Sequence, residues 1–419
     1  MKKLLIVLLS VFMVMSMAAC TSKNNNDKPA EKAEVVIWHS YTKAQKEGLE
    51  KAIADFNASQ DLYTVKAESQ PKDGLSDKIY QAVVAGNGPD MYFDYASTAA
   101  RFTLDKKAVD LSKYLKAETI ALLPEKVKAE ATSFADGGMY VFPMVSSGPI
   151  FFYNKPVFEE LGLSAPKTWA ELIDACRKIK AAHPEMKGGF AADSRTDLGN
   201  TLIYQTGNGL YDPSKDAILF NTPEVAAQLK MWQDAFQEGL FTDVHGLNDG
   251  YCSSAFNQQQ IACFIGSAAG VPYIGPDKGG PEYGFGIVPQ GGKTPWTPAW
   301  NRGMIVFNYN NEAKIKACAA FIEYFATPEV NADWCIACNY PALFPTTLEN
   351  AKYKDFASKN ASFNYLQPEI GGAAPAEGNA VMRTTIDNLL SAVEGGTDVT
   401  KALEDAVKYA KEELEASRK

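Results

Sequence analysis

Two cysteines with two residues between them are the first candidates for chemistry in this sequence. Cys335 and Cys338 lie in the stretch WCIACNYPALFP, residues 334–345. A redox pair of this kind needs its attacking thiol at the N-terminus of a helix, where the helix dipole lowers the thiol pKa. Here the segment TPEV at Thr327 predicts a helix whose far end carries both cysteines. We therefore expect two buried, apolar cysteines rather than a redox centre.

Residues that could hold a metal ion are no better placed. A zinc site would need a second cysteine pair with a similar spacing, and Cys252 and Cys263 are too far apart to supply one. The three histidines, His39, His183 and His245, stand singly, with no second histidine at the spacing of metal ligands. The sequence therefore predicts no metal site and no cofactor.

Signatures of catalysis are missing or incomplete. No Gly-x-Ser-x-Gly motif marks a hydrolase nucleophile. The segment GGKT at residues 291–294 resembles the end of a phosphate-binding loop, but Ile287 stands where that loop needs its first glycine. Acidic residues are plentiful, yet no segment isolates two of them as an acid and a base. As an enzyme, the chain therefore offers little, and the alternative to a protein without catalysis is an exported enzyme that acts on polysaccharides or redox substrates.

Strands that alternate with amphipathic helices must position these residues. The segments EVVIWHSY, YTVKAES and MYFDYA each have the pattern of a buried strand, and helices are predicted over residues 43–59 and 75–85 between them. This alternation predicts an α/β fold with a parallel sheet covered by helices. Residues 35–419 are too many for one ordinary core and enough for two domains.

Helix starts are well marked in the sequence. Thr168 and Glu171 form a capping box, and the segment TPEV opens two further helices, at Thr222 and Thr327, with a threonine cap followed by proline. Apolar residues recur every three or four positions in the helix after Thr222: Val225, Leu229, Trp232, Phe236 and Leu240. This spacing predicts a stripe that faces a core and not a ligand.

The first twenty residues, MKKLLIVLLSVFMVMSMAAC, indicate export. A short basic region precedes an apolar run over residues 4–17, which is too short for a convincing transmembrane helix. The ending Ala-Ala-Cys resembles a bacterial lipobox, so we expect residues 1–20 to be a lipoprotein signal with diacylglycerol and palmitate on Cys20. A simple cleaved signal is the alternative. Residues 21–34 have the polar composition of a flexible tether, which would hold the protein on the outer side of the cell membrane, in the periplasm or at the cell surface.

The charge of the chain limits its partners. Lysine and arginine number 41 against 50 aspartate and glutamate residues, which gives a formal net charge of −9. An acidic chain without long basic clusters argues against nucleic acid as a partner.

Several motifs occur in the order of a known family. They are AVVAGNGPDMYF, YVFPMVSSGPIFFYNKPVFEELGLSAPKTWAELIDACRKIK, FNTPEVAAQLKMWQDAF, ACFIGSAAGVPYI, and FIEYFATPEV followed by CNYPALFPTT. Together they resemble the family 1 extracellular solute-binding proteins of ABC importers, over nearly the whole chain from residue 35. Each motif alone would be weak, and their common order makes the set specific.

The resemblance implies a two-lobed, periplasmic-binding-protein-like fold of type II, with a solute held in the cleft between two α/β lobes. Hinge crossings are expected near residues 143–147, 300–303 and 340–345. Lobe 1 would comprise residues 35–143 and 304–340, and lobe 2 would comprise residues 147–299 and 345–419. The resemblance also implies a monomer that delivers its solute to the transmembrane subunits of an ABC permease.

Within the family, the chain most resembles the glycerol-3-phosphate-binding proteins. It shares their WHS motif in the first strand, the paired serines at the first crossing and a GN…R segment near the C-terminus. The candidate ligand-binding residues are Ser40, Tyr41, Asp94, Ser146, Ser147, Ser267, Trp300, Gly303, Tyr340 and Arg383. Two positions depart from the subfamily, because Leu75 replaces an aromatic residue and Ala96 replaces an acidic one.

Two kinds of carbohydrate-class solute are open at this point. A guanidinium fork forms bidentate bonds to phosphate, so Arg383 together with the serine and tyrosine hydroxyls suits a phosphorylated polyol. Tyr41 and Trp300 cluster with polar residues, the arrangement on which sugar rings stack, so a neutral sugar competes with it. Trp38 and Trp169 stand where the family uses tryptophan for packing.

Overall fold

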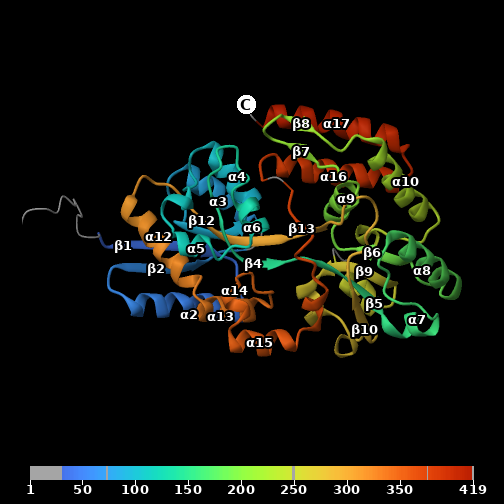
Figure 1. Ribbon diagram of the computed structural model, residues 1–419, viewed down its shortest axis with the longest axis horizontal. Coiled ribbons are helices and arrows are strands. Elements are labelled where there is room, and N and C mark those ends of the chain that lie inside the picture. Colours follow the sequence, from blue (N-terminus) through green and yellow to red (C-terminus); the bar gives the residue numbers. More distant parts are fainter. Residues whose placement is uncertain (1–30, 72–73, 248–250, 375, 418–419) are drawn as a thin grey trace, which may run out of the picture.

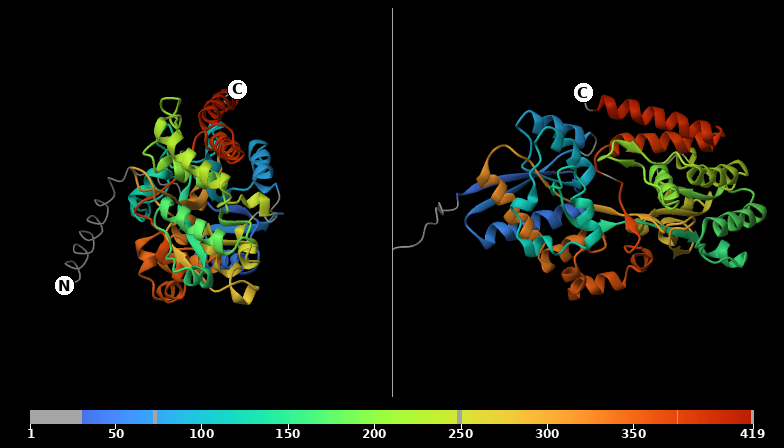
Figure 2. Two further views of the ribbon diagram at one scale, coloured as in Figure 1. Left: turned by 90° about the vertical axis from the view of Figure 1, so that its right-hand side faces the viewer. Right: turned by 45° about the horizontal axis from the view of Figure 1, so that its top comes forward.

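A computed structural model describes residues 31–71, 74–247, 251–374 and 376–417. These residues form two α/β lobes that lie side by side (Figure 1), and the turned views of Figure 2 place the two C-terminal helices along the second lobe. Cys20, the predicted signal and residues 21–30 of the predicted tether lie outside the described residues. None of the helices in the described part of the chain combines the length and the hydropathy that a membrane crossing requires.

The first lobe is built on a five-stranded sheet. Its strands, in order across the sheet, are β2 (Tyr63–Ser69), β1 (Ala33–His39), β3 (Met91–Tyr95), β12 (Trp300–Val306) and β4 (Phe142–Ser147). β1 pairs in parallel with β2 and β3, whereas β12 runs antiparallel to β3 and β4. The predicted parallel sheet is therefore mixed, because β12 begins at the edge where β3 and β4 end.

Helices cover both faces of this sheet. They are α2 (Lys43–Ser59), α3 (Leu75–Val84), α4 (Ala96–Leu104), α5 (Ala117–Ile120), α6 (Glu125–Ala131), α12 (Glu312–Phe325), α13 (Pro328–Cys338), α14 (Pro345–Leu348) and α15 (Ala351–Ser358), with the 3-10 turn η1 (Leu111–Lys113). Because side chains alternate along a strand, Val35 and Ile37 pack into the core on one face, while Trp38 packs against the core on the other.

The second lobe has a four-stranded sheet with the order β10 (Tyr283–Gly286), β5 (Pro149–Asn154), β9 (Ile261–Ser267) and β6 (Gly188–Ala192). Its helices are α7 (Lys155–Glu160), α8 (Trp169–Ala182), α9 (Arg195–Tyr204), α10 (Pro223–Gln237), α11 (Cys252–Asn257), α16 (Asn379–Glu394) and α17 (Val399–Ala416). Short elements complete the chain: β7 (Tyr211–Asp212), β8 (Ala217–Ile218), β11 (Thr297–Pro298), β13 (Gly371–Gly372), η2 (Val244–Leu247), η3 (Ala268–Tyr273), η4 (Pro276–Lys278) and η5 (Ala361–Tyr365). β11 pairs with β13, and β7 pairs with β8.

Two of the three predicted helix caps have the expected side-chain bond. The Thr168 hydroxyl accepts a hydrogen bond from the Glu171 amide at 3.2 Å, and the Thr222 hydroxyl accepts one from the Val225 amide at 3.3 Å. The Thr327 hydroxyl instead donates to the carbonyl oxygen of Tyr324 at 2.7 Å. The predicted threonine cap of α13 is wrong in this respect, because α12 ends just before Thr327 and its last carbonyl groups lie within reach of the hydroxyl.

The chain passes between the lobes at the start of β5 and at the start of β12, close to the first two expected crossings. After α13, the helices α14 and α15 still pack on the first lobe, whereas η5 packs against β5 and β10 of the second. We therefore propose that the third crossing lies near residue 360 and not at 340–345. In this proposal the boundary lies after residue 345, because Tyr353 is buried in the first lobe's core.

Cys335 and Cys338 lie at the end of α13, as predicted, and both are buried and free. Burial raises the pKa of both thiols, which makes them unreactive. Replacing both with alanine should lower the free energy of unfolding by about 1–3 kcal/mol, because buried atoms are lost from the core. Chemical denaturation measures this change. Solute affinity should stay within about threefold of the wild type, a change in binding free energy of no more than about 0.7 kcal/mol. A dithiol-reductase activity that disappears in the variant would contradict the packing role.

Candidate functional site

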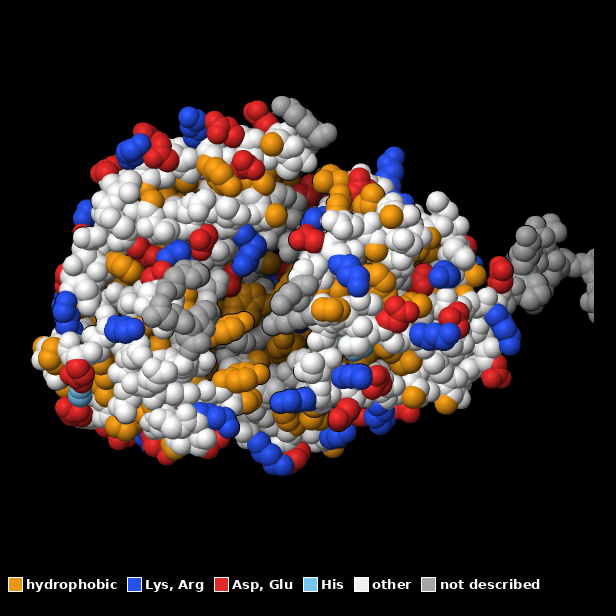
Figure 3. All heavy atoms as spheres, turned by 180° about the vertical axis from the view of Figure 1, so that it is seen from behind, with side chains coloured by type: hydrophobic (Ala, Val, Ile, Leu, Met, Phe, Trp, Pro, Cys, Tyr) orange, Lys and Arg blue, Asp and Glu red, His pale blue; other side chains and the backbone are white. Residues whose placement is uncertain are grey.

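A cavity of about 730 Å³ lies between the two lobes. The space-filling view shows the hollow, with apolar side chains inside it (Figure 3). Both lobes and the strands that cross between them contribute to its walls. A cleft at the junction of two domains is a common place for a small-molecule site.

The first lobe contributes the C-terminal end of β3 and the helix that follows it. Asp94 and Tyr95 end β3, and Thr98 lies in the first turn of α4. The Thr98 hydroxyl donates to Asp94 at 3.0 Å. Burial raises the pKa of Asp94, and the charge of Arg302 offsets part of that rise. Asp94, a predicted ligand-binding residue, lines the cavity.

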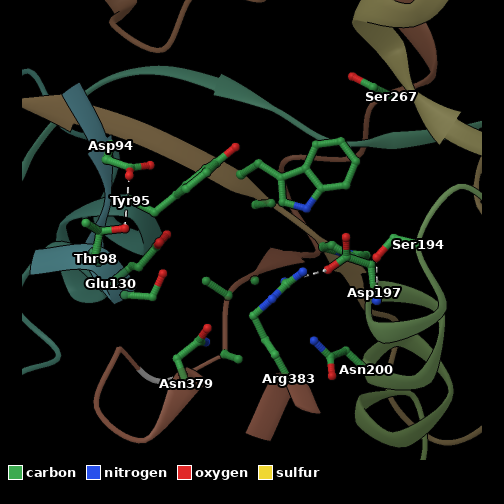
Figure 4. Close-up of a pocket in the computed structure, with 18 of the residues that line it drawn as sticks. Asp94, Tyr95, Thr98, Glu130, Ser194, Asp197, Asn200, Ser267, Asn379 and Arg383 are labelled. Atoms are coloured by element: carbon green, nitrogen blue, oxygen red, sulfur yellow. Dashed lines mark hydrogen bonds and ion pairs between the residues drawn. The ribbon is translucent and has the colours of Figure 1, made fainter. Parts of the chain in front are cut away.

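The second lobe contributes the start of α9 and one residue of α16. Ser194 caps α9 and accepts from the Asp197 amide at 3.1 Å. Figure 4 shows Arg383 reaching from α16 toward Asp197, across the pocket from Asp94 and Thr98. The Arg383 Nη1 atom lies 3.8 Å from the Asp197 Oδ1 atom, and 54% of the Arg383 side chain is exposed. Arg383 thus lines the cavity, and it already has a carboxylate partner.

Carboxyl groups outnumber cations on the cavity wall. Asp94, Glu130, Asp193 and Asp197 line it, together with Arg383. Burial raises the pKa of each of these four carboxyl groups, and that of Glu130 rises to about 7. Carboxyl oxygens accept hydrogen bonds from hydroxyl groups, so this wall suits a ligand rich in hydroxyls.

Two tryptophans add apolar surface to the cavity. Trp296 stacks on Tyr204, with 4.5 Å between the ring centroids and 16° between the planes. Trp300 begins β12 and pairs with Ser147 of β4. Because Trp300 lines both this cavity and a neighbouring one, it is the better candidate for stacking on a solute.

A side pocket of about 170 Å³ adjoins the cleft and shares Tyr95, Ser267 and Trp300 with it. Its wall consists of Tyr95, Val145, Ser146, Ser147, Ser267, Trp300, Arg302 and Tyr340. The hydroxyl oxygens of Ser147 and Ser267 are 3.5 Å apart. The structure thus brings together the four predicted hydroxyl residues of the first crossing, β9 and the end of α13.

The predicted site residues divide into those that line a cavity and those that do not. Asp94, Ser267, Trp300 and Arg383 line the cleft, and Ser146, Ser147 and Tyr340 line the side pocket. Ser40, Tyr41 and Gly303 are not among the residues that line either cavity. Their contact with a solute stays a prediction.

Tyr41 and Gly303 have packing roles in the structure. The Tyr41 ring stacks on His39 and meets the rings of Phe93 and Trp334 edge-on. A Cβ atom at Gly303 would lie 1.8 Å from the Phe142 carbonyl oxygen, so a side chain cannot fit there.

Glu130, Asp197 and Arg302 are lining residues that the sequence analysis missed. Trp300 was a candidate, and residues two apart on a strand point to the same side, so Arg302 could have been found from its spacing. Glu130 and Asp197 carry no comparable signal, because their helices reach the cleft only through tertiary packing.

Comparison with known proteins gives a consistent result. Residues 51–361 match the model of the family described as bacterial extracellular solute-binding protein. The sn-glycerol-3-phosphate-binding periplasmic protein UgpB of Rhizobium meliloti is 26% identical over an alignment of 374 residues, with 84% of each chain covered. UgpB of Brucella abortus is 24% identical over 419 residues, with 92% of this chain and 94% of UgpB covered.

Solved structures share the fold. The cyclic alpha-maltosyl-1,6-maltose binding protein of Arthrobacter globiformis superposes with a TM-score of 0.78 at 21% identity, covering 92% of this chain and 99% of that protein. UgpB of Mycobacterium tuberculosis, in complex with glycerophosphocholine, gives 0.74 at 17% identity with the same coverage. At these identities the structures establish a shared two-lobed α/β fold.

The raised pKa of Glu130 predicts a pH-dependent stability. Its pKa is about 7 in the folded protein and 4.5 in the free side chain, so the folded state holds the proton more tightly. The free energy of unfolding should therefore fall as pH rises from about 5 to 7, by roughly 1–3 kcal/mol from this residue. Glu130→Gln should flatten that fall, because glutamine keeps the bond from Asn301 without a charge.

Urea denaturation at pH 5, 6, 7 and 8 measures the effect. Glu118→Gln, on an exposed position of α5, is the control and should keep the wild-type slope. Parallel curves for Glu130→Gln and the wild type would show that Glu130 does not cause the slope.

Proposed function

The chain belongs to the bacterial extracellular solute-binding protein family, and from this premise we propose that it captures a carbohydrate-class solute, a sugar or a polyol phosphate, for an ABC importer. The observation that carries this proposal is the cleft between the lobes, whose wall combines carboxyl acceptors with Trp300. Hydroxyl groups of the solute would donate to the carboxyl oxygens, while the apolar face of its carbon skeleton would lie on the indole. The names of the relatives, which include sugar-binding and glycerol-3-phosphate-binding proteins, support the same class.

Capture would work through the two lobes. Asp94 of the first lobe and Asp197 of the second face one cavity, so a solute that fills it contacts both lobes only when they are close together. A ligand that binds one conformation more tightly shifts the population toward it. The closed, loaded protein would then be the form that the transmembrane subunits of the permease recognise. The protein would act as a monomer and without catalysis.

A native purification is the first test of this proposal. Mass spectrometry of the ligand released from the purified protein should identify a sugar or a polyol phosphate, and calorimetry with maltose and with sn-glycerol 3-phosphate should detect binding of at least one. A protein that carries no such ligand and binds neither compound would contradict the proposed function. Turnover of glycosides would favour the alternative of an exported enzyme.

Trp300→Ala should weaken solute binding about 10- to 100-fold, because it removes an aromatic face that both cavities share. Titration calorimetry with the identified solute measures the change. Trp38→Ala is a matched control, since its indole donates to Glu68 at 2.8 Å and lines neither cavity. Equal affinity losses in the two variants would indicate a general effect of removing a tryptophan.

We also propose that the lipid on Cys20 holds the protein at the membrane, as the Ala-Ala-Cys junction indicates. Two acyl chains give durable attachment, where one chain is marginal. Cys20→Ala should move the protein from the membrane fraction to the soluble exported fraction, and Cys335→Ala should leave it at the membrane. An unchanged fractionation of Cys20→Ala would contradict the anchor.

A further inference from the structure

We propose that Arg302, and not Arg383, is the cation that recognises an acidic group of the solute, and that the side pocket is where this group binds. The inference rests on the proposed solute-binding function and adds a specificity to it. The solute would be a small molecule that combines a phosphate ester or a similar compact acid with hydroxyl groups.

Arg302 lies on β12 at a position that faces the side pocket. It stands on β12 directly opposite Tyr95 of β3, and Trp300, two residues earlier, points to the same side. The pairing of β12 with β4 shifts register between Arg302 and Gly303. Such an irregularity changes the direction in which the neighbouring side chains point. Arg302 lines the side pocket together with Trp300.

The guanidinium group of Arg302 is held in place by its neighbours. Its carbon lies 5.5 Å from the ring centroid of Phe93 and 5.2 Å from that of Tyr95. The Nη2 atom donates to the Phe93 carbonyl oxygen at 3.3 Å. Stacking and a single backbone bond fix the plane of the group and leave its other donors available.

Arg302 has little charge compensation: the Asp94 carboxyl group lies near enough to interact with it, but burial raises the pKa of that carboxyl group. Within the described part of the chain Arg302 forms no ion pair, whereas Arg383 pairs with Asp197 and Arg195 contacts three carboxylates. The buried Nε atom of Arg302 has no hydrogen-bond partner among the described residues. A partly buried cation that forms no ion pair is costly, and an acidic ligand in the side pocket would add negative charge close to the guanidinium group.

Hydroxyl groups surround the guanidinium group of Arg302 in the side pocket. The hydroxyls of Ser146, Ser147, Ser267 and Tyr340 share the pocket with Arg302. Hydroxyl groups can donate to the oxygens of a phosphate that a guanidinium group binds. The pocket volume of about 170 Å³ leaves room for one compact acidic group.

The main cleft is less suited to an anion. Four carboxyl groups line it, and its lining arginine, Arg383, is partnered by Asp197 and half exposed. An acidic solute would therefore place its acid in the side pocket and its hydroxyls toward Asp94 and Glu130. This arrangement revises the expectation that Arg383 is the main partner of a phosphate.

The test compares arginine variants in calorimetric titrations with sn-glycerol 3-phosphate, inorganic phosphate and maltose. Arg302→Gln should weaken binding of sn-glycerol 3-phosphate at least 30-fold and remove detectable binding of inorganic phosphate. Arg302→Lys should recover part of the affinity, because it keeps the charge without the fork. Arg383→Gln should weaken binding of sn-glycerol 3-phosphate less than tenfold, since Arg383 is half exposed and pairs with Asp197.

Arg101→Gln is the matched control for stacking. Its guanidinium group lies 4.5 Å from the ring centroid of Tyr80, outside both cavities, and the variant should keep wild-type affinity within twofold. Thermal unfolding of the ligand-free variants separates structure from recognition. A purely structural Arg302 would lower the melting temperature and weaken maltose and sn-glycerol 3-phosphate equally. If Arg302→Gln does not fold, the loss in Arg302→Lys decides the question.

Several outcomes would overturn the inference. Binding of sn-glycerol 3-phosphate within threefold of the wild type in both Arg302 variants would do so, as would a larger loss in Arg383→Gln than in Arg302→Gln. If the wild type binds maltose but neither phosphate compound, the side pocket does not bind an acidic group, and the proposed capture of a carbohydrate-class solute still holds. A wild type that binds none of the three compounds would overturn both.

Discussion

The close contact of β12 with β4 at Gly303 is the constraint on which the site depends. Because a Cβ atom at this position would meet the backbone of Phe142 and Pro143, a glycine is what allows the strands to approach and pair. The resulting register sets Trp300 beside Ser147 and Arg302 beside Val145. Both strands lie next to crossings between the lobes, so this one contact determines which side chains reach the cleft and the side pocket.

Electrostatics then divides the site into two parts. The cleft is rich in carboxyl groups that burial makes harder to ionise, and the side pocket holds an arginine among hydroxyl groups. The two environments favour different ends of one molecule, because carboxyl oxygens accept from hydroxyl groups while a guanidinium group binds an acid. An asymmetric pair of cavities of this kind would orient a solute as well as bind it.

Buried charge elsewhere in the protein has a different purpose. Arg195 at the start of α9 contacts Asp243, which precedes η2, and Asp387 and Glu394, which both lie in α16. The carboxylates of the protein itself balance the charge of Arg195, and these ion pairs join α9 to α16. Asp197 of α9 and Arg383 of α16 face the cleft. Arg302, by contrast, forms no ion pair with the described residues, and this difference from Arg195 distinguishes a structural cation from one that is available to a ligand.

Local patterns in the sequence by themselves determined much of this protein: the helix predicted over residues 43–59 is α2, and the stripe through Val225 and Trp232 is buried core. Such features depend on neighbours a few residues away, so the periodicity and the caps contain them. The tertiary structure alone decided the rest. The hydroxyls of Ser147 and Ser267 meet across 120 residues, and the partner of Arg383 is a carboxylate on another helix. Whether a given arginine faces an acid or an empty pocket depends on strand pairing and helix packing between distant segments, which no local pattern records.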